Sequence, residues 1–184
     1  MWTNVHRPAP IFPLALYWYF EQAAASTALT GHSPREGASQ MGSDVLLDRR
    51  LAFAFLRLTL GLNILMHGAV RLPILSAFVA GLVKEFAKTL LPAVAVKAFA
   101  YSLPFEEGLV GLLVLVGLWT RNALLLGALS MAALVFGTAL LGDWNTLAIQ
   151  MLYVVIYTAL LAFREYNDYS LDALLADRGS APTV

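Results

Sequence analysis

The chain has no cysteine among its 184 residues, and its only histidines are His6, His32 and His67. The absence of cysteine excludes a disulfide scaffold, a thiol redox relay and a cysteine-held iron–sulfur cluster. Because only His67 lies in an apolar stretch, we expect no metal site and no haem held by two histidines. The formal net charge is zero, which implies no bulk attraction to nucleic acid. Any redox chemistry would therefore need a cofactor that diffuses in or that a partner carries.

Charged residues are also scarce, and apolar residues take their place. The chain is 13% charged and 59% hydrophobic, whereas soluble domains average roughly 25% and 45–50%. Residues 122–142 and 144–163 carry no formal charge, and each run can cross a hydrocarbon core of about 30 Å, which needs about 20 helical residues. The sequence therefore predicts four membrane-spanning helices, at residues 51–70, 104–120, 122–142 and 145–164.

The segment between the first two predicted spans has a different pattern. Apolar residues recur every four positions over residues 74–90, but Lys84, Glu85 and Lys88 interrupt that surface. Such a segment has too few apolar residues to span and is typical of an interfacial or bundle-capping helix. Pro104, followed by two glutamates, indicates the start of the second span. The predicted fold is all-α, an integral membrane four-helix bundle with an interfacial helix between the first and second spans.

The two ends of the chain differ from this membrane domain. Residues 1–45 are predicted to be a poorly ordered or membrane-surface extension, residues 46–176 the four-helix domain, and residues 177–184 a disordered tail. The apolar run near the N-terminus resembles a signal peptide only loosely, because Pro13 interrupts it and Glu21 follows it.

Basic residues predict the orientation in the membrane. Arginines flank the N-terminal end, the turn between the second and third spans and the C-terminal end, whereas residues 141–144 contain none. This distribution predicts that both termini lie in the cytoplasm, and we expect the membrane to be a bacterial or archaeal cytoplasmic membrane. The basic residues within 71–103 argue against this orientation.

Small residues form a stripe along the third span, at Ala123, Gly127, Ser130 and Gly137. Small side chains let membrane helices approach closely. The stripe indicates close packing within the bundle, and a homo-oligomer formed through this helix is the alternative.

Four polar residues in the first span need an explanation: Arg57, Asn63, His67 and Arg71. An arginine at mid-bilayer costs at least ~2.5 kcal/mol, so we expect Arg57 to find carboxylate, carbonyl or water partners near residues 168–172. The alternating topology places the other three at the outer end. There they would meet polar residues of the second and fourth spans, namely Glu106, Glu107, Asp143, Asn145 and Gln150.

Each of these residues also has a simpler interpretation. Glu106 in a first helical turn would complement the helix dipole. Arg71 could be a snorkelling helix end, and His67 could be a hydrogen-bonded core histidine.

Three motifs in chain order resemble those of the DoxX superfamily of small membrane proteins. The first span carries Arg57-x3-Gly61-x5-His67-Gly68-x2-Arg71, and the second carries Glu107-x3-Gly111-x5-Gly117-x2-Thr120-Arg121. The tail carries Tyr169-Ser170-Leu171-Asp172. The resemblance covers roughly residues 50–175, and the 71–103 segment with Asp143-Trp144 is most similar to the DoxD-like branch. It implies a four-helix bundle and a membrane subunit of thiosulfate:quinone oxidoreductase.

The leading functional hypothesis is therefore a membrane subunit of a quinone-linked oxidoreductase. An imidazole titrates near neutral pH, so His67 could donate to a quinone carbonyl and shuttle protons. Arg71 would stabilise negative charge on the quinone oxygen, and Glu107 would either carry protons between the site and water or orient His67. Asn63 and Gln150 complete the predicted quinone-binding set.

Electrons would come from a redox partner subunit or from an outer substrate such as thiosulfate. The alternative is a non-catalytic membrane scaffold that recruits a partner enzyme, with the buried charges locking the helices together. A small-solute transporter is a third hypothesis, but no broken helix or inverted repeat supports it.

Overall fold

The computed structural model describes the backbone of residues 34–179 and the side chains of residues 41–178. The chain divides into two units, residues 1–47 and 48–184. In the first unit the described residues, 34–47, are helical. The signal-like run, with the rest of residues 1–33, lies outside the described residues. The second unit contains the helical bundle.

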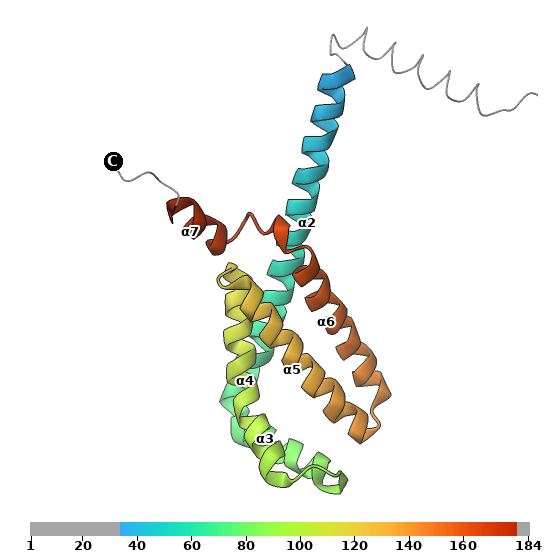
Figure 1. Ribbon diagram of the computed structural model, residues 1–184. Coiled ribbons are helices and arrows are strands. Elements are labelled where there is room, and N and C mark those ends of the chain that lie inside the picture. Colours follow the sequence, from blue (N-terminus) through green and yellow to red (C-terminus); the bar gives the residue numbers. More distant parts are fainter. Residues whose placement is uncertain (1–33, 180–184) are drawn as a thin grey trace, which may run out of the picture. The chain divides into compact units, whose positions relative to one another are not determined.

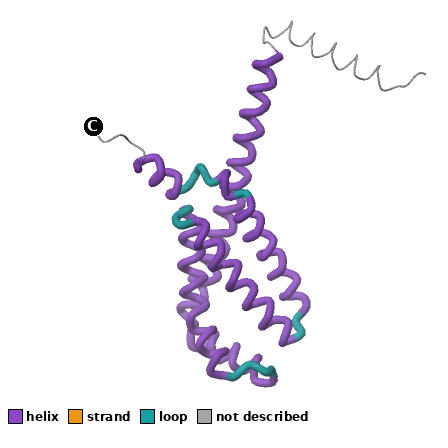
Figure 2. Tube along the Cα trace, in the orientation of Figure 1, coloured by secondary structure: helices purple, strands orange, loops and turns teal. Residues whose placement is uncertain are grey.

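The described chain is entirely helical, with short turns between the helices (Figures 1 and 2). In order, the elements are α2 (Pro34–Arg71), η1 (Leu72–Ile74), α3 (Leu75–Glu85), η2 (Phe86–Lys88), α4 (Ala93–Val116), α5 (Thr120–Leu141), α6 (Trp144–Ala162), η3 (Arg164–Tyr166) and α7 (Leu171–Gly179). Four helical segments are long and apolar enough to cross a membrane: Met41–Lys88, Ala93–Val116, Thr120–Leu141 and Trp144–Ala162. The prediction of an all-α chain with four spans is confirmed.

The outer surface of the bundle supports a membrane location. Large apolar side chains such as Phe55, Leu129 and Leu152 are between 60% and 68% exposed. Contiguous apolar surface is rare on soluble monomers, whereas in a bilayer such residues face lipid.

The second span was predicted with the wrong start. Helix α4 begins at Ala93 after Pro92, and Pro104 lies inside it. Proline is tolerated within a membrane helix when neighbouring groups satisfy the freed backbone, and here Pro104 is buried against α2 at Gly68. As a consequence, Glu106 and Glu107 lie in the middle of α4. The interpretation of Glu106 as a first-turn dipole partner is therefore wrong.

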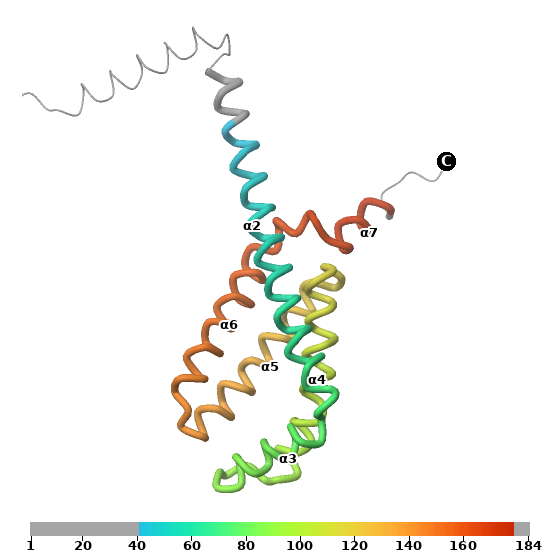
Figure 3. The backbone as a smooth tube through the Cα atoms, turned by 180° about the vertical axis from the view of Figure 1, so that it is seen from behind, coloured from blue at the N-terminus to red at the C-terminus, as the bar shows by residue number. Residues whose placement is uncertain are grey.

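Helices α2 and α4 pack backbone against backbone at the motif glycines (Figure 3). A Cβ atom at Gly61 would lie 2.5 Å from the amide nitrogen of Leu115, and one at Gly111 would overlap that of Leu65. Neither position leaves room for a side chain. This close crossing, typical of small-residue contacts in membranes, lets side chains of α2 reach α4 on both sides of it.

The small residues of α5 are used within the chain. Gly127 lies against the ring of Tyr157 on α6, since a Cβ there would overlap Cε1 of the ring. Gly137 faces Phe86, whose ring tip would lie 3.2 Å from an added Cβ. These contacts confirm close packing within the bundle, and a homo-oligomer through α5 stays a prediction.

The bundle has two ends, one near α7 and the other near α3 (Figure 1). We call one the α7 end, which contains Arg57, the α4–α5 turn and residues 164–179. We call the other the α3 end, which contains Arg71, α3, the start of α4 and the α5–α6 turn.

Candidate functional site

Arg57 at the α7 end is 2% exposed, and its guanidinium is bonded to backbone carbonyls. Nη1 donates to the carbonyl oxygens of Val114 at 2.7 Å and Leu115 at 2.8 Å, and Nη2 donates to that of Tyr169 at 2.7 Å. Val114 and Leu115 lie in the last turn of α4, where carbonyls have no partner within the helix. Arg57 thus caps α4 and ties the tail to it, which confirms the predicted partners of this arginine.

The rest of the α7 end closes around this contact. Gly117 has a φ of 71° and ends α4, and a Cβ there would lie 2.7 Å from Nη1 of Arg57. Trp119 follows with a φ of 48°. The carboxylate of Asp172 accepts from the backbone N–H groups of Trp119 at 2.7 Å and Thr120 at 2.8 Å, and so caps the start of α5. Residues from all three sequence motifs therefore meet at this end, where they hold the end of α4, the start of α5 and the tail together.

At the α3 end, Arg71 forms an ion pair with Glu107 of α4. The Arg71 guanidinium also lies 5.1 Å from the ring centroid of Phe78 on α3. The side chain of Arg71 is 26% exposed and that of Glu107 only 7%. The structure thus brings together two of the predicted catalytic residues, and it fixes the carboxylate of Glu107 from one side.

The adjacent carboxylate has a different partner. Glu106 accepts a hydrogen bond from the Ser130 hydroxyl of α5, and no cation lies within ion-pair distance of it among the described side chains. Glu106, Glu107, Ser130 and Tyr157 line a small cavity of about 10 Å³. That volume is close to the minimum for one water molecule.

Beside the Arg71–Glu107 pair lies a cavity of about 500 Å³ between α3, α4, α5 and the start of α6. Cavities of about 300–1,000 Å³ with an apolar lining and a few polar groups are typical of small-molecule sites. Much of the wall is apolar, with aromatic rings from α3, η2, α4 and α5, and the lining also contains the carboxylates of Glu85 and Asp143. The wall includes Arg71, Phe78, Phe86, Phe99, Leu103, Gly137, Thr138 and Gln150.

Gln150 carries an unpaired polar atom in this wall. Its Nε2 donates to the Thr138 hydroxyl at 2.9 Å, but its Oε1 is buried without a hydrogen-bond partner. The orientation of a side-chain amide is an assignment, and in either orientation one of its two polar atoms lacks a partner. Buried polar groups are nearly always hydrogen-bonded, and Gln150 lines the cavity, so this amide is a candidate group for contact with a polar ligand.

Asn63 and His67 lie elsewhere. Both are exposed, and they line a shallow groove of about 430 Å³ along α2. The Tyr153 hydroxyl of α6 donates to Asn63 Oδ1 at 3.0 Å, and the Tyr153 and His67 rings are in a T-shaped contact with centroids 6.4 Å apart. Through these contacts both residues face α6, and the predicted meeting of His67 with Arg71 and Glu107 is not observed.

Sequence reasoning missed several residues of the site. Thr138 and the phenylalanines of the cavity wall gave no signal beyond apolar periodicity, and Ser130 counted only as a small residue. Tyr153 and Tyr157 could have been noticed as hydroxyl groups within an uncharged run.

No group of three metal-ligating side chains occurs among the described residues. Comparisons with protein-family models, curated proteins and solved structures found no match for this chain.

Proposed function

We propose that this chain is the quinone-binding membrane subunit of an oxidoreductase. The observation that carries the proposal is the cavity of about 500 Å³ at the α3 end, where an apolar wall meets Arg71 and the unpaired amide of Gln150. A quinone has an apolar ring and tail with two oxygen atoms that require hydrogen bonds. Its chemistry matches that of this lining.

Arg71, Gln150 and Glu107 have distinct roles in the proposal. Arg71 donates to one quinone oxygen and holds Glu107 close to it. The Gln150 amide can donate to a quinone carbonyl or accept from a quinol hydroxyl, which suits both redox forms of the ligand. Glu107 carries protons towards Glu106 and the small cavity beside Tyr157. His67 and Asn63, on another face of α2, have no part in this version of the site.

The quinone supplies the redox chemistry, and the electron donor acts from outside this chain. A redox partner subunit, or a substrate such as thiosulfate as the DoxD-like resemblance implies, provides the electrons. In this proposal α3 is an interfacial helix on the outer side of a bacterial or archaeal cytoplasmic membrane, and both termini lie in the cytoplasm.

The second candidate function is a membrane scaffold that recruits a partner enzyme. The observation that favours it is the α7 end, where Arg57 fixes α4 and the tail through hydrogen bonds to backbone carbonyls. A scaffold needs the closed bundle but no ligand in the cavity.

Filling the cavity tests the proposal. Gly137→Leu should place its side chain towards Phe86 inside the cavity, whereas Gly81→Leu on α3 meets open space. We expect the purified chain to bind a short-tailed ubiquinone analogue by calorimetry. Gly137→Leu should weaken binding by roughly tenfold or more, equivalent to about 1.4 kcal/mol, and Gly81→Leu should not.

Thermal unfolding in the same detergent shows whether both variants remain folded. Absence of binding to the wild type, or equal binding by a folded Gly137→Leu variant, would favour the scaffold.

A further inference from the structure

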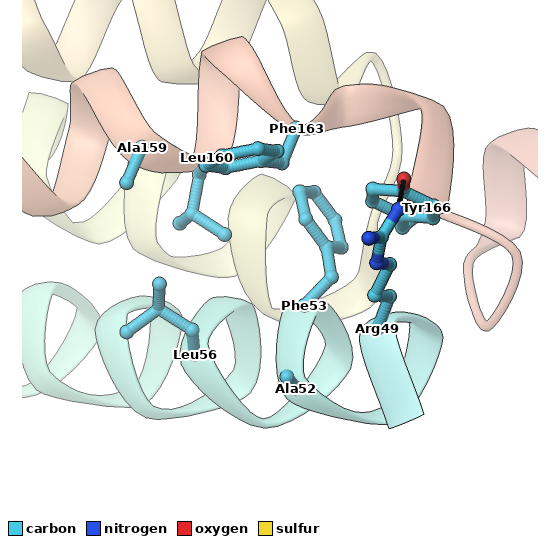
Figure 4. A pocket seen from close by; sticks show the side chains of 8 residues that line it. All are labelled: Arg49, Ala52, Phe53, Leu56, Ala159, Leu160, Phe163 and Tyr166. Atoms are coloured by element: carbon cyan, nitrogen blue, oxygen red, sulfur yellow. Dashed lines mark hydrogen bonds between the residues drawn. The ribbon is translucent and has the colours of Figure 1, made fainter. Parts of the chain in front are cut away.

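A second apolar groove lies between α2 and the end of α6, at the α7 end (Figure 4). Its volume is about 420 Å³. It is lined by Arg49, Ala52, Phe53, Leu56, Ala159, Leu160, Phe163 and Tyr166. Neither the quinone proposal nor the closure around Arg57 uses this groove.

The groove is polar at one end and apolar at the other. Figure 4 shows Arg49 and Tyr166 together at one end, with Leu56 and Ala159 farther along the helices. Helix α6 ends at Ala162, so the polar end coincides with the end of a span and the apolar end lies within it. A phospholipid has the same gradient, from its headgroup at the membrane surface to its acyl chains in the core.

The charge at the polar end selects the headgroup. The Arg49 guanidinium donates to the Tyr166 hydroxyl at 2.9 Å and lies 5.7 Å from the centroid of its ring. The neighbouring Arg50 is instead paired with Asp168 at 2.7 Å. Arg49 has five donors, so it keeps some for another acceptor, and the lining of the groove contains no carboxylate.

We propose that this groove binds one anionic phospholipid. The phosphate accepts from Arg49 beside the Tyr166 hydroxyl, and an acyl chain lies along Phe53, Leu56 and Leu160. Arginine presents a planar fork of donors that matches phosphate oxygens, and a basic pocket between membrane helices is a known setting for acidic lipid headgroups. The lipid would fill the gap between α2 and α6 and hold their ends together.

Native mass spectrometry in non-ionic detergent with equal dioleoyl-phosphatidylglycerol and dioleoyl-phosphatidylcholine tests the proposal. The wild type should retain about fivefold more phosphatidylglycerol, the preference expected from one basic residue near the headgroup. Arg49→Gln should bring the ratio close to one. Arg164→Gln removes an arginine of the same end that does not line the groove, and it should keep the preference.

A pair of alanine variants tests the acyl-chain half of the groove. Ala159→Phe fills the groove and should abolish retention of phosphatidylglycerol, whereas Ala162→Phe, on an exposed position outside the lining, should not. Equal retention of both lipids by the wild type would overturn the proposal. It would also be overturned if Arg164→Gln matched Arg49→Gln, or if Ala159→Phe retained lipid as the wild type does.

Discussion

Arg57 and Arg71 lie on the same membrane helix but in opposite kinds of environment. Arg57 is 2% exposed and is held by three carbonyl oxygens of the backbone. Arg71 has a side chain that is 26% exposed, and it faces a carboxylate, an aromatic ring and a cavity. The first arginine closes the α7 end, and the second borders a space at the α3 end.

The choice of partner explains why the two ends can differ in role. A backbone carbonyl cannot change its charge, so a contact between arginine and carbonyls is permanent once the helices are packed. The pair of Arg71 and Glu107 instead joins two side chains beside a cavity, so a ligand in that cavity can compete for the donors of Arg71. The α7 end therefore serves stability, and in the proposed function the α3 end binds the ligand.

Arg57→Leu should give the largest effect, on stability. It leaves the carbonyls of Val114 and Leu115 without their partner and releases the tail at Tyr169. Each buried hydrogen-bonding group that is left without its partner costs about 1–3 kcal/mol, and here three carbonyl oxygens lose theirs. The measurement is the free energy of unfolding in mixed detergent micelles, and membrane insertion itself should be unaffected.

Arg50→Leu is the matched control for this variant. Arg50 pairs with Asp168 at 2.7 Å, but both side chains are 47% exposed, and exposed pairs contribute about 0.2–1 kcal/mol. If Arg57→Leu lowered the free energy of unfolding no more than Arg50→Leu does, the contacts of Arg57 would not be what stabilises the α7 end.

The spans predicted most accurately are α5 and α6, because each contains a long uncharged run and a short turn marks the boundary between them. Uncharged runs separated by residues 142–144 predicted α5 and α6 to within two residues at each end. The start of α4 was predicted eleven residues too late, at 104 against Ala93, because Pro104 and two glutamates mimic a helix start. Only the packing of Pro104 against α2 shows that the helix continues through it, and that packing is not visible in the local sequence.

The candidate site could be predicted only in part. The alternating topology predicted that Arg71 and Glu107 would meet at one end of the bundle, but it did not predict that they form an ion pair. The partner of His67 depends on which helix packs against each face of α2. The sequence alone does not show how the helices are arranged around α2. The cavity depends on α3 packing against α4 and α5, which is likewise a tertiary property.

Glu107→Gln should give the second largest effect, on activity at the α3 end. The variant keeps the shape of the side chain and a carbonyl oxygen that Arg71 can reach, but it loses the proton-carrying group. Turnover per assembled complex should fall by about 10²-fold, the scale of losing a positioned acid–base group. The measurement is reduction of a short-tailed quinone by the isolated complex, with thiosulfate as the trial donor.

Glu165→Gln is the control, because Glu165 is exposed in η3 and lies outside the large cavity. It should leave turnover unchanged. Equal turnover per complex for wild type and Glu107→Gln would remove Glu107 from the mechanism and favour the scaffold.

The two ends also differ in how an aspartate caps a helix. At the α7 end Asp172 reaches the N–H groups of Trp119 and Thr120 from a distant part of the chain. At the α3 end Asp143 is the N-cap of α6 and accepts from Thr146, three residues on. The long-range cap holds a tail in place, whereas the local cap stabilises one helix turn.

Asp143 should therefore give the smallest effect, visible as a pH dependence. Hydrogen bonds from the Thr146 hydroxyl and backbone N–H hold the pKa of Asp143 below its ordinary value, which is roughly 3.9 in an unfolded chain. A carboxyl with a lowered pKa in the folded state contributes stability above the unfolded pKa and loses it as the pH falls through the folded pKa. Asp143→Asn keeps a good N-cap without this titration, so the unfolding temperatures of wild type and variant should converge as the pH falls below about 4. A constant difference across that range would show that the charge of Asp143 does not contribute to the cap, and the contrast with Asp172 would then rest on distance along the chain alone.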